Sequence, residues 1–131
     1  MDEKTLEKMA KEYKEAFARS ADDTIDRIVN LEEEQLDCLD ELAFRSPGRV
    51  NRTVSYLKTL TYRTLSRLSA LKNETYLPSV RSRCPTPNAL QRFSSLQVDI
   101  FVLYDTMPSD DELTELLSLE NRKAALIGGL L

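Results

Sequence analysis

The longest unbroken helical pattern in this sequence covers residues 2–44, which contain neither glycine nor proline. Apolar or small side chains recur along the segment at steps of mostly three and four, the period of an α-helix. They are Leu6, Ala10, Tyr13, Phe17, Ala21, Ile25, Ile28, Leu31, Leu39 and Leu42. An uninterrupted helix of about 43 residues would be about 65 Å long. Because no core of a 131-residue globule is that long, such a helix would project and need a partner.

One local signal interrupts this pattern near Ser20. The run Ser20-Ala-Asp-Asp23 has the form of a helix start, with Ser20 as the N-cap and an acid three residues later. We therefore expect a helix over residues 3–19, then either a kink or direct continuation into a helix over residues 21–44. Whether this region is one helix or two stays open at the level of sequence.

The cleanest helical segment covers residues 50–72 and follows a turn at Ser46-Pro47-Gly48, where proline and glycine end the first segment. A heptad seam holds for three repeats through Val50, Val54, Leu57, Thr61, Thr64, Leu68 and Leu71, and Leu60 and Leu65 widen it. The opposite face carries Arg52, Lys58, Arg63 and Arg67. The segment is therefore predicted to bury one face and to expose a basic one.

These two segments predict the fold class. Residues 1–72 are expected to form a long helical hairpin, with an acidic helix over 2–44 and a basic helix over 50–72 lying antiparallel. The sequence thus predicts an all-α protein with long amphipathic helices in an antiparallel αα-hairpin or a coiled-coil or bundle arrangement. Two shorter helices are expected in the C-terminal segment 89–131, and helix content should exceed about 60%, well above the average for globular proteins.

Residues 73–88 separate the two parts of the chain. Prolines at 78, 85 and 87 bar a regular helix from this segment. Since 16 residues make a long connection by the standards of one domain, we expect either a flexible linker or a functional segment.

The C-terminal segment is expected to hold two helices. Thr86 as N-cap and Pro87 as the first helical residue would open a helix over about 88–104. Its inward residues would be Leu90, Phe93, Leu96, Ile100 and Tyr104, and a strand over 98–104 is the alternative. Ser109 as N-cap, followed by acids, predicts a second helix from 109 to about 127, ended by Gly128-Gly129.

Composition removes most catalytic chemistry. The chain has no histidine, so it cannot build Ser-His-Asp or Cys-His catalysis or a histidine zinc site. Three glycines cannot form a phosphate-binding loop, and two cysteines are too few for a disulfide scaffold. We expect no cofactor, no metal and no enzymatic activity. No apolar run is long enough to span a membrane, and the start, Met-Asp-Glu-Lys, has no secretory pattern.

Charge is strongly segregated along the chain. Residues 1–44 carry a net charge of −8, residues 45–83 carry +8 and residues 84–131 carry −4. Either the basic segment folds back against the acidic ones, or it meets nucleic acid, an acidic partner or a membrane surface. The residues of the predicted basic surface are Arg52, Lys58, Arg63, Arg67, Arg81 and Arg83. The overall pI of about 5.0 favours internal neutralisation over nucleic-acid binding.

We interpret the chain as a non-catalytic protein–protein interaction module, a small subunit or scaffold of a multiprotein complex. It should not be a stable compact monomer, because its helices have more apolar surface than one small domain can bury. The expected interaction residues are Val54, Leu57, Leu60, Leu65, Leu68, Leu71, Leu113, Leu116 and Leu117. The last three belong to an LxxLL pattern. Partners would be other protein subunits, in a homo- or hetero-oligomer, within the cytoplasm or nucleus. Nucleic-acid binding by residues 45–83 is the alternative.

Overall fold

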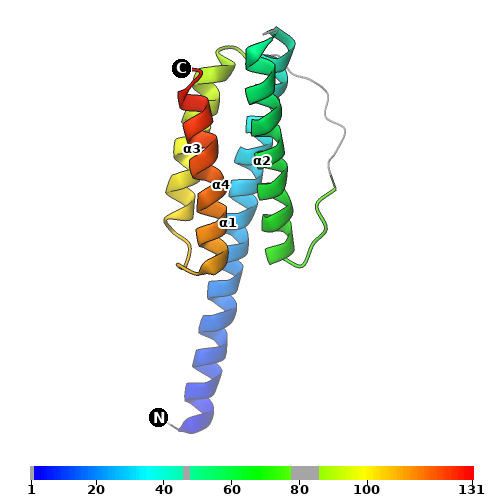
Figure 1. Cartoon of the computed structure of the whole chain (residues 1–131). Coiled ribbons are helices and arrows are strands. Elements are labelled where there is room, and N and C mark those ends of the chain that lie inside the picture. Colours follow the sequence, from blue (N-terminus) through cyan, green and yellow to red (C-terminus); the bar gives the residue numbers. More distant parts are fainter. Residues whose placement is uncertain (1, 46–47, 78–85) are drawn as a thin grey trace.

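The computed structural model describes residues 2–45, 48–77 and 86–131, and helix accounts for 83% of them. These residues form four α-helices: α1 (Glu3–Arg45), α2 (Arg49–Leu71), α3 (Ala89–Tyr104) and α4 (Asp111–Gly128). No strand occurs in the described ranges, so the all-α prediction is confirmed. The alternative strand over 98–104 is wrong, because that stretch is the last part of α3. Figure 1 shows the four helices packed side by side, with the start of α1 extending beyond the others.

α1 is one uninterrupted helix of 43 residues, about 65 Å long at 1.5 Å per residue. Ser20 does not cap a second helix. Its backbone carbonyl instead accepts a hydrogen bond from the Thr24 hydroxyl at 3.0 Å, within the helix. The N-terminal cap lies at Asp2, whose carboxylate accepts from the backbone N–H of Thr5 at 2.8 Å. The helical period therefore continues through the position where the sequence also allowed a break.

Gly48 reverses the chain between α1 and α2. Its φ of +86° is a conformation that L side chains rarely adopt, and a Cβ there would have nothing within 4 Å. Backbone conformation, rather than lack of space, therefore requires glycine at this position. The neighbouring Ser46 and Pro47, which the sequence assigned to the same turn, lie outside the described residues.

α2 ends at Leu71, one residue before its predicted end. Asn73 follows with a left-handed φ of 57°. The backbone N–H groups of Asn73 and Glu74 donate to the carbonyls of Ala70 at 3.0 Å and Ser69 at 2.9 Å. Paired bonds of this kind satisfy carbonyls at the end of a helix, and asparagine is the commonest substitute for glycine at the left-handed position.

The predicted cap of α3 is wrong. Thr86 and Pro87 precede the helix, which begins at Ala89 after Asn88. Asn88 has a left-handed φ of 53° and makes no side-chain cap hydrogen bond. Asparagine tolerates this conformation better than most residues, so the chain turns there instead of at the proline.

The predicted cap of α4 is displaced by one residue. Asp110, rather than Ser109, is the N-cap, and its carboxylate accepts from the backbone N–H of Leu113 at 2.8 Å. A carboxylate at this position also interacts favourably with the positive end of the helix dipole, which a serine hydroxyl does not.

The helices form a bundle in which α1 packs against α2 and α3, and α4 packs against the same two helices. Figure 1 shows α1 and α4 running one way along the bundle and α2 and α3 the other way, so each packed pair is antiparallel. α2 therefore ends, and α3 begins, at opposite ends of the bundle. The connection between them has to cover the length of the helices, which accounts for its unusual length of 17 residues between Leu71 and Ala89.

Two apolar clusters make up the core. The cluster nearer the projecting end of α1 contains Ile25, Ile28, Leu68, Ile100, Tyr104, Leu113 and Leu116. The other cluster draws on all four helices and contains Leu36, Cys38, Leu39, Val54, Leu57, Leu65, Ala89, Phe93, Leu96 and Ile127. The segments 1–72 and 89–131 thus share one core, and neither helix pair buries its apolar face alone.

Candidate functional site

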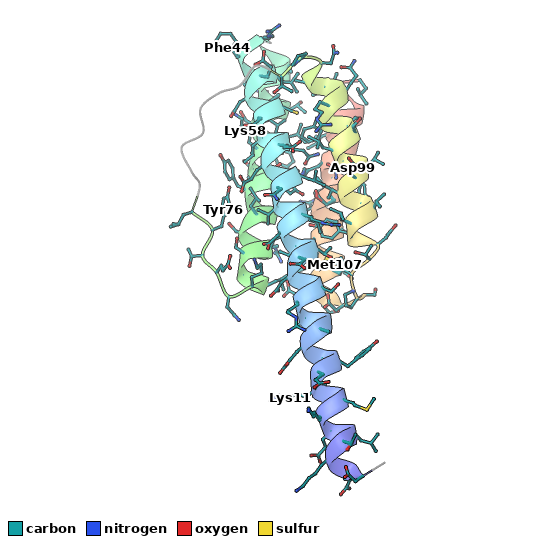
Figure 2. All side chains as sticks on the ribbon, turned by 180° about the vertical axis from the view of Figure 1, so that it is seen from behind. Lys11, Phe44, Lys58, Tyr76, Asp99 and Met107 are labelled. Carbon is teal, nitrogen blue, oxygen red and sulfur yellow. The ribbon has the colours of Figure 1, made fainter. Side chains whose placement is uncertain are left out.

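The first part of α1 stands clear of the bundle. We call residues 3–20 the N-terminal arm; all of its described side chains are exposed. Burial begins with the half-buried Ala21 and Thr24 and is nearly complete at Ile25. Figures 1 and 2 show this section of α1 running alone beyond the ends of the other helices. At 1.5 Å per residue the arm is about 27 Å long.

Large apolar side chains are exposed on one side of the arm. Leu6 is 52% exposed, Met9 53% and Tyr13 75%. Spacings of three and four residues place these side chains on neighbouring positions of one helix face. A single exposed leucine is ordinary, but an apolar stripe on a helix that touches no other part of its own chain is a typical docking face.

Two hollows flank α1 where the arm leaves the bundle. One has a volume of about 280 Å³, and its lining includes Ser20, Thr24, Arg27, Leu103, Met107 and Pro108. The other has a volume of about 250 Å³, and its lining includes Ile25, Leu71, Met107, Leu113 and Leu116. Both include the turn between α3 and α4, which Figure 2 marks at Met107. The base of the arm is therefore bordered by accessible, partly apolar surface.

A cluster of six polar side chains lies inside the bundle, which we call the internal polar cluster. Its members are Glu32 and Gln35 from α1, Gln97 and Tyr104 from α3, and Glu120 and Lys123 from α4. Gln97 is 3% exposed and Tyr104 is 1% exposed, while the other four are completely buried. Along each helix these residues lie between or beside the positions of the two apolar clusters. The bundle thus has a polar middle layer.

Lys123 is the centre of the cluster. Its Nζ donates to a carboxylate oxygen of Glu32, to Oε1 of Gln35, and to Oε1 of Glu120 at 3.0 Å. These three bonds use all three N–H groups of the ammonium. Nζ also lies 5.8 Å from the centroid of the Phe93 ring, within the range of a cation–π contact.

The two glutamines extend the network to α3. Gln35 Nε2 donates to the backbone carbonyl of Phe93 at 3.3 Å and to Oε1 of Gln97 at 3.1 Å. Gln97 Nε2 in turn donates to Oε1 of Glu120 at 3.3 Å. Gln35 therefore joins α1 to α3, and Gln97 joins α3 to α4, so the cluster fixes the rotational setting of three helices.

The two carboxyl groups cannot both be ionised without cost. Burial raises the pKa of Glu32 well above its usual range; the neighbouring carboxyl of Glu120 adds to this, while Lys123 opposes it. Oε1 of Glu32 and Oε2 of Glu120 have no hydrogen-bond donor among the described residues. A proton on Glu32 removes one buried negative charge and supplies a donor between the two carboxyls.

Lys123 keeps its charge in this setting. Burial disfavours the ammonium, but the carboxylates of Glu32 and Glu120 outweigh that effect and raise the pKa of Lys123 above its usual value. Burial, together with the same two acids, raises the pKa of Tyr104 far above the physiological range, so its hydroxyl stays protonated. Because these groups are sealed from solvent, the cluster can hold a proton but cannot contact a substrate.

The predicted interaction residues lie mostly inside this chain's own core. Val54, Leu57, Leu60, Leu65 and Leu68 are at most 1% exposed, and Leu113 and Leu116 are also buried. Leu117 is half-buried and packs beside the cluster nearer the arm, whereas Leu71 is 38% exposed. Within a single chain, then, the heptad seam and the LxxLL leucines contact the protein's own helices, and the arm supplies the exposed apolar face.

The predicted basic surface is divided between internal ion pairs and open surface. Lys58 pairs with Asp40 on α1 at 2.7 Å, and Arg67 pairs with Glu115 on α4. Acids on neighbouring helices therefore reach both side chains, although Arg67 remains exposed and Lys58 is half-buried. Arg52 and Arg63 are exposed. Arg81 and Arg83 lie outside the described residues.

Other acidic residues of α1 pair with residues of α3 and α4. Glu34 pairs with Arg92 on α3 at 2.8 Å, and Glu32 pairs with the buried Lys123. Part of the acidic surface of α1 is thus neutralised by α3 and α4, because α1 packs on two helices and not on α2 alone.

Cys38 packs as a small apolar residue. It is 1% exposed, and burial raises the pKa of its thiol to about 11. Among the described residues, no group of three or more acidic, cysteine or histidine side chains has a metal-binding arrangement. In that same part of the chain, no helix combines the length and apolar character needed to cross a bilayer.

The internal polar cluster was not predicted from the sequence, although a signal for it exists. In α1 the buried positions Ile25, Ile28, Glu32, Gln35 and Leu39 follow steps of three, four, three and four. In α4 the same steps connect Leu113, Leu116, Glu120, Lys123 and Ile127. The signal that could have revealed the cluster is the presence of charged residues within the apolar stripes of two helices. An acid in the stripe of α1 and a lysine in the stripe of α4 can balance each other.

Comparison with known protein families, curated proteins and solved structures found no significant match to this chain.

Proposed function

We propose that this chain is a non-catalytic helical interaction module, a small subunit or scaffold that assembles with other protein through coiled-coil packing. The observation that carries the proposal is the N-terminal arm, which exposes Leu6, Met9 and Tyr13 on the section of α1 that extends beyond the other helices. The four-helix bundle would hold the arm in a fixed orientation.

Helix energetics support this role. An isolated helix of 18 residues is marginal in water, because nucleation is costly and most helical stability comes from packing. The arm continues the anchored part of α1, so its nucleus is already supplied by residues 21–45. A partner helix would therefore meet a preorganised face, and little ordering entropy would oppose binding.

The chemistry of the described residues supports a non-catalytic role. The strongest perturbation of ionisable groups occurs in the internal polar cluster, whose charged members are completely buried. The chain also lacks histidine, the usual acid–base catalyst near neutral pH. The buried thiol of Cys38 suits a reducing compartment, in keeping with the cytoplasmic or nuclear location proposed from the sequence.

Site-specific photo-crosslinking in cells tests the proposal. A photoreactive amino acid at position 9 or 13 of the full chain should form crosslinks to protein on the apolar face of the arm. The same group at position 11, which Figure 2 marks away from the bundle, serves as the matched control on another face of the arm. Crosslinks at 9 and 13 that exceed those at 11 support the proposal, and equal or absent crosslinks at all three positions contradict it.

A second candidate function is nucleic-acid binding by the outer face of α2. The supporting observation is that Arg52 and Arg63 are exposed alongside Tyr56 at 48% and Tyr62 at 42%. Such a face would bind phosphates through arginine and stack bases on tyrosine. Gel shifts with DNA and RNA at physiological salt would test it. Micromolar binding lost in Arg52→Glu/Arg63→Glu, with helix content unchanged, would favour this candidate over the interaction module.

A further inference from the structure

We infer that the partner of the N-terminal arm is the arm of a second copy of this chain, paired antiparallel about a centre between residues 11 and 12. The inference rests on the proposed function, since it names the occupant of the face described there. Three independent properties of the arm support it: the sizes of the facing residues, the positions of the charges and the length of the arm.

The first property is size complementarity along the apolar seam. Leu6, Ala10 and Tyr13 follow steps of four and three, which is the pattern of a coiled-coil seam. In the antiparallel register, Ala10 of each copy lies opposite Tyr13 of the other, so a small residue faces a large one twice. A parallel, in-register pair would instead place Tyr13 against its own equivalent and Ala10 against its own, giving crowding in one layer and a void in the next.

The second property is charge complementarity beside the seam. Glu7 and Lys14 each follow a seam residue and flank the same side of it. In the antiparallel register, Glu7 of one copy meets Lys14 of the other, and symmetry repeats the pair. In the parallel register, Glu7 would meet Asp2 and Lys14 would meet Met9, which gives one repulsion and no ion pair. Flanking charges of this kind set the orientation of paired helices, so the arm favours the antiparallel dimer.

The third property is the length of the arm. In the proposed register, position 2 of one copy lies opposite position 21 of the other. Pairing therefore uses the whole exposed part of α1 and stops where burial in the bundle begins at Ala21. Each N-terminus would lie at the edge of the hollow beside Ser20 and Ala21 of the other copy. The two bundles would lie at opposite ends of the paired arms, related by a twofold axis.

The expected affinity is modest. Fewer than three heptads of seam, with ion pairs exposed to solvent, give weak association for a coiled coil. Sedimentation equilibrium on the full chain from about 1 µM to about 500 µM covers the corresponding range of dissociation constants. The wild type should pass from monomer to dimer within this range, and a chain that stays monomeric throughout overturns the inference.

Charge reversal tests the register. Glu7→Lys and Lys14→Glu should each weaken self-association by roughly tenfold, because two attractive pairs become repulsive. An equimolar mixture of the two variants should dimerise about as tightly as the wild type or more so, because one variant is then basic at both positions and the other is acidic at both. The double variant Glu7→Lys/Lys14→Glu should recover wild-type association. Stronger dimerisation of Glu7→Lys alone would indicate the parallel register and overturn the antiparallel one.

Matched controls separate assembly from folding. Positions 7 and 14 are exposed and outside both apolar clusters, so thermal unfolding of the bundle should be unchanged in all three variants. Lys8→Glu, on another face of the arm, should leave the dissociation constant unchanged. If the arm crosslinks in cells only to a different protein while the wild type stays monomeric in solution, the second copy is the wrong occupant and the proposed function still holds.

Discussion

The Lys123 ammonium on α4 donates a hydrogen bond to the Glu32 carboxyl on α1, and the two completely buried side chains are 91 residues apart in the sequence. α1 and α4 lie diagonally in the bundle, and each packs on α2 and α3. The pair therefore connects the two helices across the interior. Gln35 and Glu120 accept the other two hydrogen bonds of Lys123, and Gln97 donates to Glu120, which turns one long-range contact into a layer that specifies how the helices face one another.

Removing the cation should be strongly destabilising. Lys123→Met leaves buried carboxyl groups without their positive partner, and we expect the free energy of unfolding to fall by about 3–5 kcal/mol. Urea unfolding measures the loss. Lys58→Met is the control, because Lys58 pairs with Asp40 at the surface and should cost no more than about 1 kcal/mol. Equal losses in the two variants would mean that the internal polar cluster contributes no more than a surface pair.

Protonation of Glu32 predicts a particular dependence of stability on pH. Because the pKa of Glu32 is raised in the folded state, the folded protein binds its proton more tightly than the unfolded chain does. The stability that Glu32 contributes is therefore complete below its unfolded pKa of about 4.3 and is lost as the pH rises through its folded pKa. Relative to Glu32→Gln, which mimics the protonated acid, the wild type should lose stability as the pH increases from about 4.5.

Urea unfolding of the wild type and of Glu32→Gln, measured at a series of pH values from about 4.5 upwards, checks the prediction. Glu12→Gln, an exposed change on the arm, is the matched control and should follow the wild type at every pH. If the curves of the wild type and Glu32→Gln run parallel, the folded protein holds no extra proton at Glu32.

The buried seam of α2 predicts a large difference between neighbouring positions. Leu57 is completely buried, so Leu57→Asp places a carboxyl group in the core and should cost several kcal/mol or prevent folding. Ser55 is exposed, and Ser55→Asp should change stability by less than about 0.5 kcal/mol. Helical circular dichroism and thermal melting measure both. Lys58, which is next to Leu57 in the sequence, is a poorer position for this control, because an aspartate at position 58 would lie beside the carboxylate of Asp40.

The start of α4 gives a test of capping at single-residue resolution. Asp110→Ala removes the acceptor for the backbone N–H of Leu113 and should lower the free energy of unfolding by about 1 kcal/mol. Ser109→Ala should have a much smaller effect, since the structure assigns the cap to its neighbour. A larger loss of stability in Ser109→Ala than in Asp110→Ala would mean that Ser109, the residue predicted from the sequence, is the N-cap.

The helical character of residues 2–44 and the buried face of α2 could be predicted because both follow from local periodicity, but the sequence left open whether residues 2–44 form one helix or two. Steps of three and four define a face whatever the rest of the chain does, and Val54, Leu57 and Leu68 accordingly lie in the core. The projecting arm follows from the same reasoning, since a helix as long as α1 exceeds the bundle. Helix ends were less predictable, because Asn73 and Asn88 take left-handed backbone conformations that could not be predicted from the sequence pattern.

The internal polar cluster was missed for a different reason. Glu32 has the residue type of a solvated helix face, and only a partner on another helix makes its burial tolerable. That partner, Lys123, is far away in the sequence, and its place on the apolar stripe of α4 does not indicate which residue it contacts. The same limit applies to Arg92 on α3, because no local feature of the sequence indicates that it pairs with Glu34 on α1. Long-range pairing decides these cases, and periodicity alone gives no information about it.

The contact between the first and last helices also bears on how the chain is made. Domains fold as units, and during synthesis the N-terminal parts of a chain emerge first. α1, α2 and α3 leave the ribosome before α4, so for that interval Glu32 and Gln35 have no Lys123 to contact. A nascent chain of three helices would have to bury an unpaired acid in order to close. The core of this bundle is therefore completed only after α4 has emerged.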